Sequence, residues 1–130
     1  MPSISIAGLN CNVSAELSGP FAVVLDAEDP EWSDPTWLDR KVSDLLDLGC
    51  SFFVCFGVNS ETIHDAIDDV VIRRGDSVEG PVLTTFHADE KLDEVVFFFL
   101  SVAMAEGRQG VVLVSDHAAW EKELRRQGAL

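Results

Sequence analysis

Basic residues are scarce in this chain of 130 residues. Nine Lys and Arg stand against 23 Asp and Glu, so the formal net charge is −14. Proteins that bind nucleic acid neutralise phosphates with clustered Lys and Arg, and the same residues attract proteins to anionic lipid. We therefore expect no nucleic-acid and no membrane partner. The negative field either attracts a basic protein partner or only keeps an apolar domain in solution.

Cysteine is also rare, with only Cys11, Cys50 and Cys55 present. An odd number without a C-x-x-C pair argues against a disulfide framework and a structural zinc site. Cys55 lies within an apolar run, which is typical of a buried thiol and not of a nucleophile. The N-terminus has neither the basic segment nor the long apolar segment of a secretory signal. We expect a cytoplasmic protein.

Motifs with a known chemistry are missing. Neither G-x-G-x-x-G nor G-x-x-x-x-G-K-[ST] occurs, and Gly57-Val58-Asn59-Ser60 is the nearest candidate for a phosphate loop. A G-x-S-x-G nucleophile elbow is absent too, which argues against a serine hydrolase. Of the residues that define phosphorelay receivers, only Asp26 at the end of a predicted strand has an equivalent. The sequence predicts no cofactor.

Apolar residues, by contrast, are abundant at 47% of the chain, enough for a hydrophobic core. The most apolar stretch runs from Val95 to Ala105, where Ser101 is the one polar residue. It is shorter than the roughly 20 residues that span a bilayer. A helix that is apolar on every side has to be covered on every side. We expect this helix, which ends at Gly107, to pack on a sheet with one face and on another surface with the other.

Four short apolar runs, which begin about thirty residues apart, predict strands separated by amphipathic helices. This alternation predicts a three-layer α/β/α sandwich with a mainly parallel four-stranded sheet, flavodoxin-like or Rossmann-like. We predict the order 2-1-3-4 for these strands. Residues 1–20 are an expected irregular arm with a candidate extra edge strand at Ser3–Ile6, and residues 21–130 an expected single domain. The predicted strands are Phe21–Asp26, Ser51–Gly57, Val82–Phe86 and Gly110–Asp116, and the helices Pro35–Leu48, Asn59–Arg74, Asp89–Gly107 and Ser115–Gln127.

Histidines and carboxylates gather at the predicted carboxyl ends of the strands, where parallel sheets bind their ligands. His and Asp side chains there are typical of a zinc or manganese site or of acid–base catalysis. The alternative is that each only caps the helix that follows. The candidate catalytic or metal-binding residues are Asp26, His64, His87, Asp116 and His117.

Two short segments, Thr84-Thr85-Phe86-His87 and Cys55-Phe56-Gly57 with His64-Asp65, give the chain a resemblance to a known family. In these residues it resembles an uncharacterised family of small bacterial α/β domains, over about residues 50 to 105. The resemblance implies an α/β fold. It implies no activity and assigns no functional residue.

Aromatic residues supply the candidate interface. Phe97, Phe98 and Phe99 point in directions about 100° apart on a helix, so two face the sheet and a neighbouring helix while the third is available to a partner or lies under the N-terminal arm. Trp32 and Trp37 form a candidate second patch or cover their own core edge. The sequence thus predicts a small acidic, non-enzymatic binding protein. It is an immunity-type protein or an accessory subunit that recognises a basic or hydrophobic protein, or a homodimer; the alternative is the metal-dependent or acid–base enzyme described above.

Overall fold

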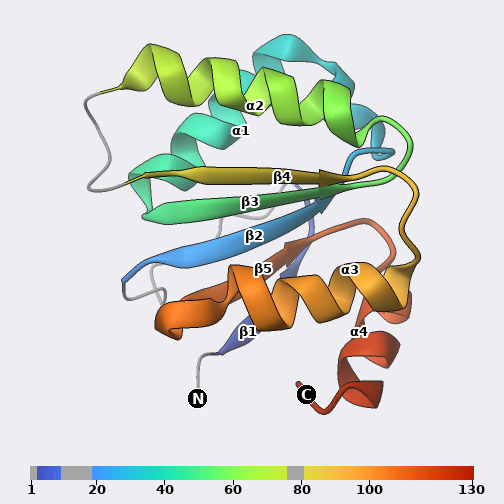
Figure 1. The fold of residues 1–130 in the computed structure, drawn as a ribbon. Helices are drawn as coiled ribbons and strands as arrows, with labels where there is room; N and C mark the ends of the chain where they lie inside the picture. Colours follow the sequence, from blue (N-terminus) through green and yellow to red (C-terminus); the bar gives the residue numbers. More distant parts are fainter. Residues whose placement is uncertain (1–2, 10–18, 76–80) are drawn as a thin grey trace.

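The protein is a three-layer α/β/α sandwich built on one parallel sheet (Figure 1). The computed structural model describes residues 3–9, 19–75 and 81–130. The predicted fold class is confirmed, with five strands in place of four. The strands are β1 (Ile4–Ala7), β2 (Phe21–Asp26), β3 (Cys50–Phe56), β4 (Leu83–His87) and β5 (Gln109–Leu113). The helices are η1 (Pro30–Ser33), α1 (Pro35–Asp47), α2 (Ser60–Arg74), α3 (Leu92–Phe98), η2 (Phe99–Ala103), η3 (Ala105–Gly107) and α4 (His117–Arg126).

The sheet has the strand order β1-β5-β2-β3-β4. The candidate edge strand in the N-terminal arm is β1, which pairs in parallel with β5. The predicted order of the four main strands is wrong, because they lie as β5-β2-β3-β4. Right-handed crossovers through α1 and α2 move the chain one strand at a time from β2 to β4. The connection through α3 then returns on the other face and places β5 beyond β2. Residues 10–18 of the arm, including Cys11, lie outside the described residues.

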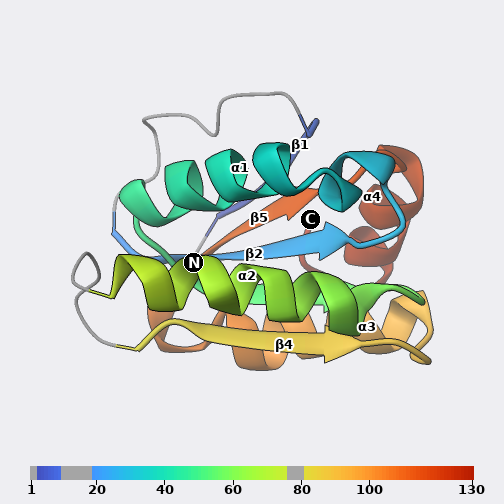
Figure 2. The same cartoon turned by 90° about the horizontal axis from the view of Figure 1, so that it is seen from above.

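Two hydrophobic cores fill the spaces between the sheet and its helices. Figure 2 shows α1 and α2 over one face, with α3 and α4 on the opposite side. Along β2, Val23 and Leu25 face the α1–α2 core, while Ala22 and Val24 face the α3–α4 core. Successive residues of a strand point to opposite faces, so a strand covered on both sides is apolar throughout. This explains the continuous apolar runs in the sequence.

Local signals set the start of α1. The Asp34 carboxylate accepts hydrogen bonds from the backbone N–H groups of Thr36, at 3.0 Å, and Trp37, at 3.3 Å. Pro35 follows as the first helical residue. A backbone N–H at this position makes no hydrogen bond within the helix, so proline, which has none, is tolerated there. The helix therefore starts at the residue that the sequence predicts.

The predicted helix before Gly107 consists of three pieces: α3, the π-helical turn η2 and the 3₁₀ turn η3. In η2 the backbone N–H of Met104 donates to the carbonyl of Phe99 at 2.9 Å, the i to i−5 bond of a π-helix. Among the described residues, no helix combines the length and apolar character needed to cross a bilayer. The sheet covers one face of this segment, but its other face is not fully covered within the described chain, because Phe97 is 66% exposed and Val102 is 44% exposed.

Candidate functional site

The loop after β2 is hydrogen-bonded to its neighbours at the edge of the sheet where this fold is expected to bind ligands. The connections after β2 and β5 lead to opposite faces of the sheet, which makes the ends of these two strands the switch point. There the buried Asp29 carboxylate accepts a hydrogen bond from the Ser115 backbone N–H at 3.2 Å. The Glu28 carboxylate accepts one at 3.0 Å from the backbone N–H of Asn59, which belongs to the nearest candidate for a phosphate loop. Acidic side chains thus tie the loop after β2 to its neighbours.

The two aspartates predicted for catalysis bond to the backbone near them. Asp26 accepts from the Glu28 backbone N–H at 2.9 Å, and Asp116 accepts from the Ala119 backbone N–H at 3.2 Å as the N-cap of α4. Burial raises the pKa of Asp26 above its ordinary value of 3.8, and the nearby carboxylates of Asp29, Glu28 and Asp116 raise it further, while the hydrogen bond from Glu28 lowers it. The arrangement therefore disfavours the charged form of Asp26.

We expect Asp26→Asn to raise the melting temperature at pH 7. The folded protein holds the Asp26 proton to higher pH than the unfolded chain does, so stability falls as the pH rises from 3.8 through the raised pKa. Asparagine is neutral and keeps an oxygen to accept from Glu28. Thermal unfolding from pH 3.5 to 8 measures the difference, which should shrink as the pH falls toward 3.8. Asp89→Asn removes the same charge from an exposed loop and serves as control; an equal gain there would contradict the local origin of the effect.

His64 lies on α2 against the edge strand β4. Its Nε2 is 3.1 Å from the carbonyl oxygen of Thr84, and its Nδ1 is 3.0 Å from Asp65 Oδ1. The ring centroid lies 5.0 Å from that of Phe86. His64 therefore faces the α1–α2 side of the sheet and bonds within that layer.

His87 ends β4 on the other side of the sheet. Its ring packs on Phe98, with 4.5 Å between centroids, its Nε2 is 3.0 Å from Thr85 Oγ1, and its Nδ1 contacts the Glu90 carboxylate. A hydroxyl, an imidazole and a carboxylate in this order occur in nucleophilic catalysis. Here the imidazole is buried, and Thr85 does not line the groove described below. The contacts instead hold Glu90 close to Phe98.

The five predicted catalytic residues do not form one site. Phe86 and His87 are adjacent on β4 and point to opposite faces, so their partners His64 and Phe98 lie on opposite sides of the sheet. His117 begins α4 and is exposed. Within residues 3–9, 19–75 and 81–130, no three His, Cys, Asp or Glu side chains are arranged to hold a metal ion.

The predicted interface aromatics divide between core and surface. Trp32 is buried and packs edge-to-face on the half-buried Trp37, with 4.9 Å between ring centroids. Phe99 is fully buried at 0% exposure, so it does not present a surface to a partner. Phe98 is half-buried, and Phe97 is exposed. Of the three phenylalanines, Phe97 and Phe98 remain available for contact.

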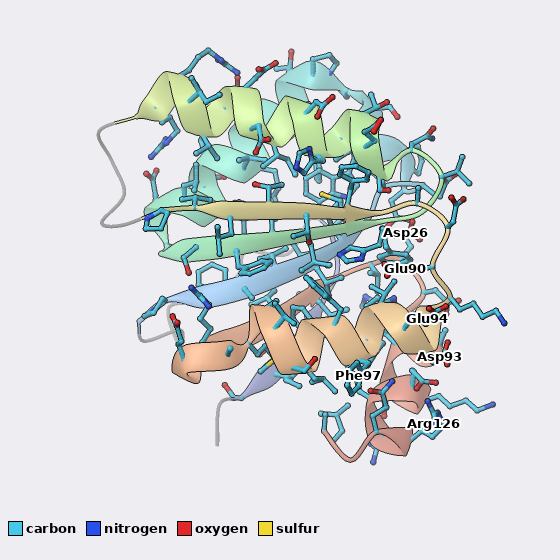
Figure 3. All side chains as sticks on the ribbon, viewed as in Figure 1. Asp26, Glu90, Asp93, Glu94, Phe97 and Arg126 are labelled. Carbon is cyan, nitrogen blue, oxygen red and sulfur yellow. The ribbon has the colours of Figure 1, made fainter. Side chains whose placement is uncertain are left out.

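A groove of about 630 Å³ lies between α3 and α4. Figure 3 shows Asp93, Glu94 and Phe97 of α3 on the side that faces Arg126 of α4. The residues from the α3 segment recur at intervals of three and four, which places them on one helical stripe. The Gln127 side-chain amide donates to the Asp93 carbonyl at 3.0 Å and fixes the end of α4 beside the start of α3. The lining residues are Glu90, Asp93, Glu94, Phe97, Phe98, Ser101, Val102, Arg126 and Gln127.

The groove is acidic at one end and apolar at the other. Glu90, Asp93 and Glu94 lie at the start of the stripe, and Phe97 and Val102 lie further along it. Among the described residues that line the groove, Arg126 is the one cation, and its Nε donates to the Glu123 carboxylate at 2.9 Å. Hydrogen bonds from Arg126 and Gln127 lower the pKa of Glu123, which keeps this neutralising charge in place. The three acids of the stripe therefore dominate the charge of the groove.

Sequence reasoning missed most of this groove. Of the described lining residues, only Phe97 and Phe98 are among the predicted interface residues. The spacing of Glu90, Asp93, Glu94 and Phe97 is a signal that a search for a mixed acidic and apolar helical stripe finds. The sequence gives no sign that α4 contributes Arg126 and Gln127 to the groove. These two residues line it only because α4 packs beside α3.

The comparisons with known proteins give a family and no activity. A family model with the description "Domain of unknown function (DUF7684)" matches residues 9–129. No curated protein and no solved structure is significantly similar to the chain. The resemblance to an uncharacterised family is thereby confirmed, over a longer stretch than residues 50 to 105.

Proposed function

Since the chain belongs to the DUF7684 family, whose description states no function, we propose from the site alone that it is a protein-binding module. The α3–α4 groove accepts a segment of a protein partner that is both apolar and basic. We favour this function over the enzymatic alternative because, among the described residues, His64 and His87 lie on opposite sides of the sheet, although Asp26 and Asp116 lie near each other.

The observation that carries this proposal is the exposure of Phe97 inside an acid-rimmed groove. Isolated exposed apolar residues are ordinary on protein surfaces. Phe97 differs because the half-buried Phe98 and the exposed Val102 lie beside it and Asp93 and Glu94 border it. Aromatic side chains that enter such hollows supply a large part of the binding free energy of interfaces. The acids add selection for a basic partner and a faster encounter.

We expect Phe97→Ser to weaken binding of the partner by about thirtyfold or more, because it removes an aromatic contact at the centre of the groove. Proteins that co-purify with the wild-type chain are quantified by mass spectrometry, and the dissociation constant of the retained partner is then measured by calorimetry. Phe97 is exposed, so the substitution leaves the fold intact, which the melting temperature checks.

Phe86→Ser is the matched control. Phe86 is also an exposed phenylalanine, at 43%, but it lies on β4 against α2 and outside the groove. It should leave the partner's affinity unchanged. A partner that binds the Phe97 variant as tightly as the wild type would show that the groove is not the binding site.

A further inference from the structure

We propose that the segment bound in the groove is an amphipathic helix that lies antiparallel to α3 and carries Lys or Arg in its C-terminal turn. This inference rests on the proposed function and adds the conformation, polarity and charge placement of the partner. It commits to a helix of another protein.

The walls of the groove favour a helix over an extended segment. Both walls are helices, whose backbone N–H and C=O groups bond within their own turns, so they offer no free ladder to an incoming strand. A helix satisfies its own backbone and presents only side chains. The helical part of the stripe, from Asp93 in α3 to Val102 in η2, is at most about 14 Å long at a rise of 1.5 Å per residue, which matches two to three turns of a partner helix.

The charges of the groove are distributed unevenly along α3. Glu94 is held at the start of the helix, where its Oε1 accepts from the Lys91 backbone N–H at 3.1 Å. Asp93 lies beside it, and Phe97 and Val102 occupy the next two turns. A complementary helix therefore needs its cations at the end that lies beside Asp93 and Glu94, and its apolar residues along the part that lies over Phe97 and Val102.

The direction follows from helix dipoles. Cations are favourable in the last turn of a helix and unfavourable in its first turn. A partner with cations in its last turn pairs with Asp93 and Glu94 only if its C-terminus lies beside the N-terminus of α3. In that antiparallel arrangement the negative end of one helix lies beside the positive end of the other. A parallel partner needs its cations in its first turn, where its own dipole opposes them.

The end of α4 already lies with this polarity against the start of α3, although Arg125 and Arg126 pair with Glu121 and Glu123 of α4 itself. α4 carries Arg125 and Arg126 in its last turn, and its end lies against the start of α3 through the hydrogen bond from Gln127 to the Asp93 carbonyl. The incoming helix repeats this relation on the open side of α3.

A second copy of this chain fits the groove poorly. Each copy carries a net charge of −14, so two copies repel each other. Besides α4, α2 also ends in two arginines, Arg73 and Arg74. They already pair with Asp39 and Asp47. The observations thus favour a different, basic protein as the source of the helix.

Two synthetic peptides test the inference on the full-length chain. Each has about 16 residues, long enough to form an amphipathic helix when its apolar face packs in the groove, and both have the same composition and blocked ends. The first peptide has Lys and Arg in its C-terminal turn, and Leu and Phe along one face of the preceding turns. The second peptide has Lys and Arg in its N-terminal turn, and Leu and Phe along one face of the following turns. Fluorescence polarisation at low salt should show that the wild-type chain binds the first peptide about fivefold more tightly than the second. The ratio of the two dissociation constants should move toward one in the double variant Asp93→Asn, Glu94→Gln. Asp44→Asn with Asp69→Asn removes the same charge from exposed positions on α1 and α2 and should preserve the preference.

The outcomes separate this inference from the proposed function. If the wild-type chain binds both peptides equally and the Phe97→Ser variant binds neither, the predicted direction of the helix is overturned and the groove remains the binding site. No binding of either peptide, with a co-purified partner still lost in Phe97→Ser, would overturn the helical occupant alone. If the Phe97→Ser variant binds the partner and the peptides as tightly as the wild type does, both the proposed function and this inference are overturned. A dimer in analytical ultracentrifugation that Phe97→Ser dissociates would identify a second copy as the occupant and overturn the inference.

Discussion

Phe99→Ala should lower the free energy of unfolding by about 3–5 kcal/mol, while Phe97→Ala should change it by no more than about 0.5 kcal/mol. The two residues have the same chemistry and lie two positions apart. Phe99 is fully buried against the sheet, and its truncation leaves a cavity, whereas Phe97 is largely in solvent. Urea unfolding followed by tryptophan fluorescence measures both values, with Trp32 and Trp120 as buried reporters.

The two variants control for each other. Similar denaturant slopes for the wild type and both variants would show that the difference lies in the folded state. Losses of similar size at the two positions would contradict the placement of Phe97 on the surface. Such a result would also remove the observation on which the proposed function depends.

Gly110→Val should cost about 3 kcal/mol of unfolding free energy, the upper part of the usual range for overpacked cores. A Cβ atom at Gly110 would lie 2.6 Å from Met104 Sδ and 3.0 Å from two ring carbons of Phe99. The Met104 side chain can move aside, but the buried Phe99 ring has no free space. Because Gly110 has no side chain, η2 can approach the sheet closely at this position of β5. Thermal and urea unfolding measure the loss of stability when valine is introduced there.

A double variant checks this cause. Met104→Ala is destabilising by itself, because Met104 is buried. It also removes one of the clashing atoms, so Gly110→Val with Met104→Ala should cost less than the sum of the two single changes. Strict additivity would show that the valine does not meet Met104. The Phe99 ring would then be the remaining source of the strain.

Features set by neighbouring residues were predictable from the sequence. The start of α1 depends on Asp34, Pro35 and the two N–H groups that Asp34 accepts from, all within four positions. Trp120 and Leu124 lie four residues apart on α4, a spacing that places two apolar side chains on one face of a helix, and both are buried. The β-branched run Val70-Val71-Ile72 is typical of a strand, yet it is helical in α2, where Val70 continues the buried stripe of Ile63 and Ile67.

The candidate site was predictable only in part. The stripe from Glu90 to Val102 is local and readable from its spacing. The opposite placement of His64 and His87 is not, because it depends on two helices that cover different faces of β4. The charge of the groove depends on Glu123 pairing with Arg126, and on α4 lying beside α3.

By itself, the sequence determined the alternation of strands and helices, their approximate bounds and the acidic surface. These follow from hydrogen bonding and apolar periodicity over a few residues. Only the tertiary structure decided the strand order, which of three consecutive phenylalanines faces solvent, and the meeting of α3 with α4. Each of these depends on contacts between residues far apart in the chain, and an apolar strand or helix has the same pattern whichever neighbour it packs against.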